Sequence, residues 1–180
     1  HYIFIILLLC IQIYVYVNIL DTVYFGIMLA SKKDWGQSAW NFMHVIACKI
    51  KPEEFVNQKG HILNIIRGIC TNVPCKDCRE HAVKQINQLR LSSIRSREDL
   101  ISMLHDFHNK VNVRTHKALY KREDLKVYEE MSTGEVVHKF FETWTLGSST
   151  PRLMMDTFAR VQLLKYIRDY FNSHSMKYNP

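Results

Sequence analysis

This chain has few cysteines, no long run of basic residues and, in residues 31–130, no segment with the alternating pattern of a strand. Five cysteines in 180 residues, unevenly spaced, are too few for a fold held together by disulfides. The 24 basic residues form no run of Lys or Arg longer than two, so the net charge of +7 predicts an ordinary basic surface and no nucleic-acid partner. No stretch of residues 31–130 alternates apolar and polar residues as a strand does, which excludes a sheet as the core.

The N-terminal segment, residues 1–30, allows two interpretations. Residues 2–20 form a nearly uncharged apolar run, about long enough to span a bilayer as a helix. If the run spans a membrane, Lys32 and Lys33 favour a cytoplasmic position for the rest of the chain. Alternatively, the chain begins with His, and Met28 precedes the first globular motif, so residues 1–27 are upstream sequence that the working protein lacks. A membrane anchor and a non-native segment both stay open.

The remainder has helical periodicity and a composition that is 47% hydrophobic, as expected of a folded core. A first helix is predicted from Trp35, a second from Pro52, a third from the Cys-x-x-Cys, and a fourth from Ser96 to about Lys117. Ser96 with Asp99 three residues later forms a capping-box pattern. A short fifth helix is expected at 122–130. The predicted fold of residues 31–130 is an all-α four-helix bundle plus this short helix, followed by a partly helical extension, residues 131–180, of unknown role.

The stretch "CTNVPCKDCREH", residues 70–81, gathers the side chains most suited to chemistry. Cys70, Cys75, Cys78 and His81 could supply four zinc ligands, although their spacing is cramped for a structural site. Thioredoxin-like exchange also uses a Cys-x-x-Cys at a helix start, but it needs a βαβ setting. A flavin-linked disulfide is the third alternative, because "HNKVN" could offer apolar area and hydrogen bonds to a flat ring. The twelve residues alone do not decide among these.

Three motifs, taken together, resemble the Erv/ALR family of FAD-dependent sulfhydryl oxidases. They are "WGQSAWNFMH", "PCKDCREH" and "HNKVNVRTHK", in the order and at the spacing typical of that family, within about residues 34–130. The resemblance implies a helical bundle that binds FAD between its helices, commonly as a homodimer. It also implies that Cys75 and Cys78 are the redox-active disulfide. The residues implied to bind the cofactor are Gly36, Trp40, His44, His108, Asn109, Val111, Asn112, Lys117 and, as a looser match, Tyr128.

Two departures from the cellular members of the family bear on the expected function. His105 stands near the place where those members carry a structural cysteine, and there is no second Cys-x-x-Cys to act as a shuttle. The pattern is therefore more similar to the sulfhydryl oxidases of large DNA viruses, which implies a location in the host cytoplasm or virion, with a membrane anchor as an option.

The implied activity is the oxidation of thiol-containing protein substrates, thioredoxin-like proteins among the candidates. Electrons would pass through Cys75 and Cys78 to FAD and then to O2, giving H2O2. No catalytic metal is expected. The alternative is a zinc-stabilised helical interaction module without enzymatic activity.

Overall fold

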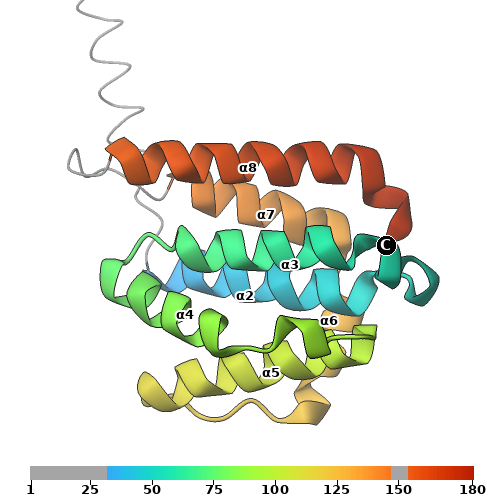
Figure 1. Cartoon of the computed structure of the whole chain (residues 1–180), viewed down its shortest axis with the longest axis horizontal. Coiled ribbons are helices and arrows are strands. Elements are labelled where there is room, and N and C mark those ends of the chain that lie inside the picture. Colours follow the sequence, from blue (N-terminus) through green and yellow to red (C-terminus); the bar gives the residue numbers. More distant parts are fainter. Residues whose placement is uncertain (1–31, 147–153) are drawn as a thin grey trace, which may run out of the picture.

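The computed structural model describes residues 32–146 and 154–180, which form helices stacked in layers (Figure 1). The α-helices are α2 (Lys32–Lys49), α3 (Phe55–Thr71), α4 (Lys76–Gln88), α5 (Arg97–Arg114), α6 (Lys126–Glu130), α7 (Thr133–Leu146) and α8 (Met154–His174). Short 3-10 turns lie at Pro52–Glu54, Leu91–Ser93, Arg122–Leu125 and Ser175–Lys177. Within these ranges there is no β-strand, only an isolated antiparallel bridge between Ile50 and Tyr178. The all-α prediction is confirmed.

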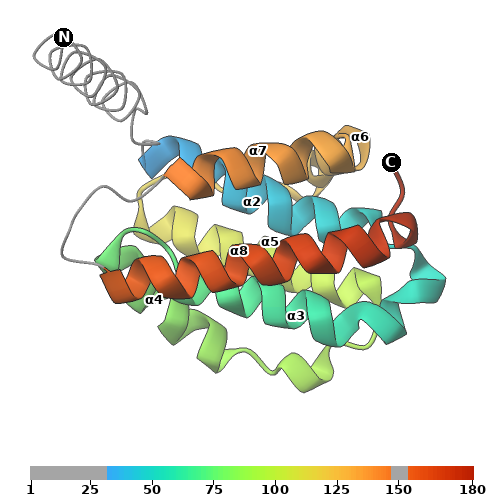
Figure 2. The same cartoon turned by 90° about the horizontal axis from the view of Figure 1, so that it is seen from above.

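Helices α2 and α3 form the central layer. On one side α7 packs against α2 and α8 against α3; on the other side α5 and α6 pack against α2, and α4 against α3 (Figures 1 and 2). The four helices predicted between residues 31 and 130 are α2 to α5, and the short fifth is the turn at Arg122–Leu125 continued by α6. The predicted hydrophobic segment, residues 1–30, lies outside the described residues. No helix in the described ranges is long and apolar enough to cross a membrane.

Helix α2 is enclosed on several sides because it lies between α7 and α5. Every residue from 42 to 50 is buried, including Phe42, Val45 and Ile46 with no exposed surface. A helix that is buried all round belongs in the interior of a fold, whereas a surface helix shows a single apolar stripe. Helix α2, which carries the motif "WGQSAWNFMH", is therefore an interior helix of the fold.

Helix α5 begins as its sequence predicts and ends three residues early. The Ser96 side chain accepts a hydrogen bond from the Asp99 backbone N–H (3.1 Å), and the Asp99 carboxylate accepts one from the Ser96 N–H (2.9 Å). At the other end His116 takes a left-handed φ of 54°, and the Lys117 N–H bonds to the Asn112 carbonyl at 2.9 Å. A left-handed residue in this position ends a helix and turns the chain back.

The C-terminal extension is part of the main core. Phe140 and Trp144 of α7 and Ile167 of α8 have no exposed surface, and they belong to the same hydrophobic cluster as Phe42 and Ile66 of the central layer. The partly helical character of residues 131–180 was predicted, but the helix α7 was not. The sequence of α7 does not show what its apolar residues pack against, and the structure shows that they pack against α2.

Candidate redox site

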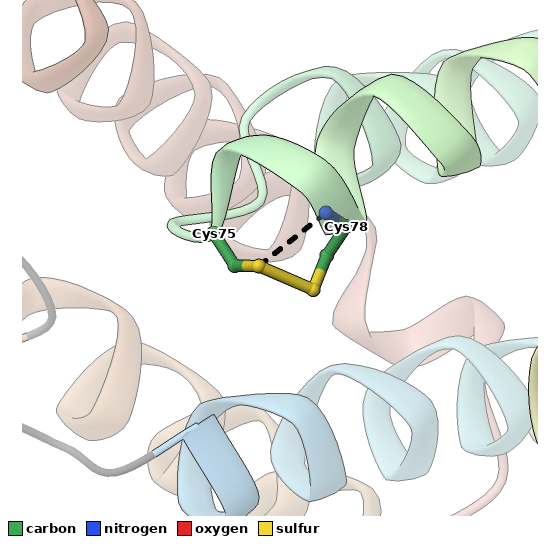
Figure 3. The surroundings of a disulfide bond; sticks show 2 residues. All are labelled: Cys75 and Cys78. Atoms are coloured by element: carbon green, nitrogen blue, oxygen red, sulfur yellow. Dashed lines mark hydrogen bonds between the residues drawn. A yellow bond between two sulfur atoms is a disulfide. The ribbon is translucent and has the colours of Figure 1, made fainter. Parts of the chain in front are cut away.

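Cys75 and Cys78 form a disulfide at the start of α4, with Cα atoms 5.2 Å apart (Figure 3). Cys75 is the N-cap of α4, and its sulfur accepts a hydrogen bond from the Cys78 backbone N–H at 3.3 Å. Both cysteines are half-buried and pack against the main hydrophobic core. Backbone N–H groups at a helix start favour negative charge, so this position would stabilise a Cys75 thiolate when the disulfide opens.

The second part of the site is a cluster of two histidines and two aromatic rings between α2, α5 and α6. The Trp40 ring stacks on the His108 ring (centroids 4.0 Å apart, planes 4° apart), and the His44 ring stacks on the Tyr128 ring (4.5 Å, 10°). His44 Nε2 and His108 Nδ1 are joined by a hydrogen bond of 3.1 Å. Four of the nine residues predicted from the resemblance therefore touch one another, although they come from three helices.

Burial keeps both imidazoles neutral. It lowers the pKa of His44 to about 3, with smaller contributions from the charges of His108 and His105. Burial likewise lowers the pKa of His108 to about 4, helped by the charges of Lys117 and His105. The Nδ1 atom of His44 is buried and has no hydrogen-bond partner. A buried polar atom without a partner is rare in native folds and is an expected place for a ligand atom.

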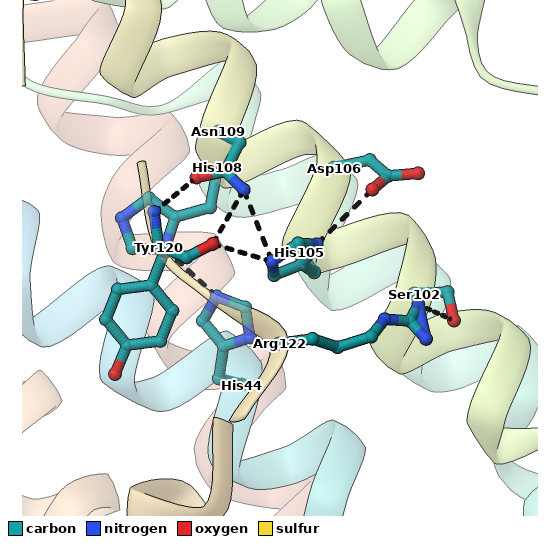
Figure 4. Close-up of polar contacts among 8 residues, drawn as sticks. All are labelled: His44, Ser102, His105, Asp106, His108, Asn109, Tyr120 and Arg122. Carbon is teal, nitrogen blue, oxygen red and sulfur yellow. Dashed lines mark hydrogen bonds and ion pairs between the residues drawn. The ribbon is translucent and has the colours of Figure 1, made fainter. Parts of the chain in front are cut away.

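The Asn109 side chain is bonded to the backbone of the chain that follows α5 and is not part of the ring cluster. Its amide donates to the Tyr120 carbonyl (2.9 Å), and its side-chain oxygen accepts from the Tyr120 backbone N–H (2.8 Å) (Figure 4). The same Tyr120 carbonyl accepts a hydrogen bond from His105 Nε2 at 2.8 Å. Asn109 and His105 thus hold the returning chain against α5, so Asn109 positions another residue within the site.

That residue, Tyr120, was not predicted. Its ring lies 5.6 Å from the His108 ring at 14° and 6.0 Å from the Tyr128 ring, which extends the row of flat side chains. The available signal was an aromatic residue three positions after Lys117, the last residue of the third motif. This signal is weak, because Tyr120 reaches His108 only through the reversal of the chain at His116.

The other predicted cofactor residues lie around the cluster. Gly36 is half-buried, and a Cβ atom built on it would have no neighbour within 4 Å, which leaves open space above this turn of α2. Val111 is half-buried and Asn112 buried on α5, one turn after His108. Lys117 is exposed, yet its charge is close enough to act on His108. Open backbone, flat rings, a partnerless buried nitrogen and a cation together fit a large planar cofactor that carries phosphate.

The four candidate zinc donors do not assemble. Cys75 and Cys78 are bonded to each other, and Cys70 is a buried free thiol. Within the ranges that the structure describes, no three His, Cys, Asp or Glu side chains come together as a metal site requires.

The Cys75–Cys78 disulfide packs on the same hydrophobic core as Trp40, which belongs to the cluster of neutral imidazoles and stacked rings. The fold and site together define an all-helical bundle that carries a Cys-x-x-Cys disulfide. The chain belongs to the Erv1/Alr family, whose model matches residues 37–132, just over half of its length.

Two relatives carry names that describe an activity. The chain is 30% identical over 91 residues to a candidate FAD-linked sulfhydryl oxidase of Invertebrate iridescent virus 3, covering 50% of this chain and 62% of that protein. It is 27% identical over 82 residues to the FAD-linked sulfhydryl oxidase ERV1 of Arabidopsis thaliana, covering 46% of this chain and 42% of that protein. The aligned part is therefore less than two thirds of either relative. No solved structure matches significantly.

Proposed function

We propose that this chain is an FAD-dependent sulfhydryl oxidase that forms disulfides in thiol-containing proteins. The observation that carries the proposal is the Cys75–Cys78 disulfide at the start of α4, within the same family-matched segment as the His44–His108 cluster. The names of the two relatives support the same activity.

The protein steps of the reaction follow from disulfide exchange. A substrate thiolate attacks the sulfur of Cys75, a bond forms between substrate and Cys75, and the Cys75–Cys78 bond breaks with Cys78 leaving as thiolate. A second substrate thiolate then attacks the substrate sulfur of this mixed disulfide. The substrate leaves with a new disulfide, and Cys75 leaves as a thiolate that the Cys78 N–H and the start of α4 stabilise. The substrate has lost two electrons, and the cysteine pair has gained them.

The groups that would hold the cofactor are those of the cluster. Trp40, His108, Tyr120 and Tyr128 offer flat faces, His44 Nδ1 offers a buried hydrogen-bonding nitrogen, and Lys117 offers a positive charge for phosphate. FAD, when bound, would accept the two electrons and pass them to O2, giving H2O2. The protein's contribution is to place the cofactor against the core that carries the disulfide and to keep both imidazoles uncharged.

One preparation tests this proposal against the zinc-stabilised alternative. The purified chain is expected to show flavin absorbance and to contain no stoichiometric zinc by metal analysis. Cys78→Ser is expected to retain the flavin but to lose oxidation of a small dithiol under air. Cys48→Ser, which alters a buried thiol outside the cysteine pair, is the matched control and should retain both. A colourless, zinc-loaded protein would overturn the proposal.

A further inference from the structure

Helix α2 presents two nearly opposite faces. An α-helix advances about 100° per residue, so Trp35, Ser38 and Phe42 share one side. Trp40 and His44 lie on the other side, toward α5 and α6, where they form the cluster described above. The redox site therefore uses one face of α2 and leaves the opposite one for a different partner.

Helix α7 covers that opposite face. The rings of Phe42 and Phe140 are stacked with centroids 4.3 Å apart, and both side chains have no exposed surface. The Trp144 indole N–H donates to the Trp35 carbonyl at 3.1 Å. The hydroxyls of Ser38 and Thr143 are 2.5 Å apart, and both residues are buried. Aromatic stacking, a buried indole hydrogen bond and paired hydroxyls make this a specific interface.

Helix α8 covers α3 in the same layer (Figure 2). A Cβ atom at Gly68 would lie 2.5 Å from Cδ1 of Leu163, so the absence of a side chain at Gly68 is what lets Leu163 approach α3. At the outer edge of the same contact, His61 Nδ1 and the Tyr166 hydroxyl are joined by a hydrogen bond of 2.8 Å. Helices α3 and α8 are thus joined by a close contact at Gly68 and by a side-chain hydrogen bond at His61.

The end of the chain closes this layer onto the rest of the fold. The Lys51 N–H donates to the Lys177 carbonyl (3.0 Å), and the Asn179 N–H donates to the Lys49 carbonyl (2.8 Å). The Thr133 hydroxyl at the start of α7 donates to the Asn179 carbonyl at 2.7 Å. Both ends of the α7–α8 segment are thus tied to each other and to the end of α2.

The family match stops at residue 132, immediately before α7. A domain ending there would expose Phe42 and the apolar neighbours of Gly68, and a contiguous apolar face of this kind normally marks an interface with another chain. We propose that residues 133–180 take the place of a second subunit on the α2–α3 face. The oxidase unit is completed within one chain, and this face does not pair with another copy. The homodimer that the family resemblance implies would then not use α2 and α3.

A cross-link across α2 and α7 tests the proposal in the full chain. In Ser38→Cys/Thr143→Cys, two sulfurs would replace oxygens that are 2.5 Å apart, a separation that suits a disulfide. Oxidation is expected to give a product that migrates as a single chain of 21.3 kDa on a denaturing, non-reducing gel. Peptide mass spectrometry should find the new disulfide between positions 38 and 143. Ser38→Cys alone should give no covalent dimer.

A covalent dimer from Ser38→Cys alone would show that two α2 helices meet, and one from the double variant would show that α7 is exchanged between chains; either result would overturn the proposal. Ser38 and Thr143 are buried, so a failure of the double variant to fold would leave the first test without a result. A second pair of substitutions at exposed positions therefore repeats the test. His61→Cys/Tyr166→Cys alters exposed positions whose rings are 6.3 Å apart, and a short bismaleimide should join them within one chain. Linkage only between chains, or none, would count against the proposal. Neither readout depends on flavin or turnover.

Discussion

The indole ring of Trp40 lies flat on the imidazole ring of His108, with centroids 4.0 Å apart and planes 4° apart. This stack joins α2 to α5, and the 3.1 Å hydrogen bond between His44 and His108 joins the same two helices one turn further along. The rings that would receive the cofactor therefore also stabilise the bundle, and changes at His108 should alter both properties.

His108→Ala is expected to reduce both flavin content and stability. The change removes the stack and leaves the second nitrogen of buried His44 without a partner, and a buried unsatisfied polar group costs about 1–3 kcal/mol. The measurements are the flavin-to-protein ratio after gel filtration and the urea midpoint. His138→Ala, at an exposed position of α7, is the control and should leave both unchanged. Full flavin content in His108→Ala would contradict the assignment of this cluster.

Stability should fall as the pH is lowered from about 6.5 toward 4. In the folded protein the pKa of His44 is about 3 and that of His108 about 4, against 6.5 for an ordinary histidine. Between these values the unfolded chain binds protons that the folded chain does not, so acid favours unfolding. Each histidine contributes at most about 1.4 kcal/mol per pH unit to this slope. Urea midpoints measured across this range should fall more steeply for the natural protein than for His44→Phe. Parallel profiles would show that His44 is not held neutral by the fold.

The local parts of this site could be predicted from the sequence. The capping box at Ser96 and Asp99 and the N-cap position of Cys75 depend on residues within four positions of each other. Trp40 and His44 are four residues apart, and this spacing alone puts both side chains on one face of a helix.

The other parts of the site and of the fold depend on contacts between residues far apart in the sequence, which the sequence pattern does not show. The Asn109 amide binds Tyr120 only because the chain reverses at His116. Gly68 and Leu163 meet across 95 positions, and neither residue alone indicates that α8 lies there. The apolar side of α7 has the same origin, because it becomes interpretable only once Phe42 is known to lie opposite Phe140.

Asn109→Ala should loosen the cofactor site without touching the four-residue cluster. The change removes two hydrogen bonds to the Tyr120 backbone, each with a net contribution of about 1 kcal/mol. Tyr120 would then lose its fixed position beside His108. We expect weaker FAD binding, measured by titrating the flavin-stripped protein, with a smaller loss in the urea midpoint. Asn87→Ala, at an exposed position of α4, is the control. FAD affinity equal to that of the control would show that the Tyr120 segment does not contribute to binding.

Two glycines of α3 should respond in opposite directions to alanine. Gly60→Ala adds a methyl group with no neighbour within 4 Å, and it should stabilise the protein by about 0.5–1 kcal/mol because glycine is a poor helix former. Gly68→Ala places its methyl group 2.5 Å from Leu163 Cδ1 and should destabilise the protein by about 1–3 kcal/mol. Leu163→Ala in the Gly68→Ala background should recover part of the loss in a double-mutant cycle. If both glycine variants gained stability equally, the close contact between α3 and α8 would be refuted.

Cys70 should be dispensable for the redox reaction despite being five residues from Cys75. It is 2% exposed, and burial raises the pKa of its thiol to about 12, so at pH 8 only on the order of one molecule in ten thousand carries the reactive thiolate. Burial also raises the pKa of Cys48, to about 11, which makes that residue an internal reference. We expect iodoacetamide to label neither residue in the native oxidised protein and both after denaturation, as read by peptide mass spectrometry. Cys70→Ala should oxidise a small dithiol at the natural rate per bound flavin. A large loss of turnover at unchanged flavin content would instead make Cys70 a participant in electron transfer.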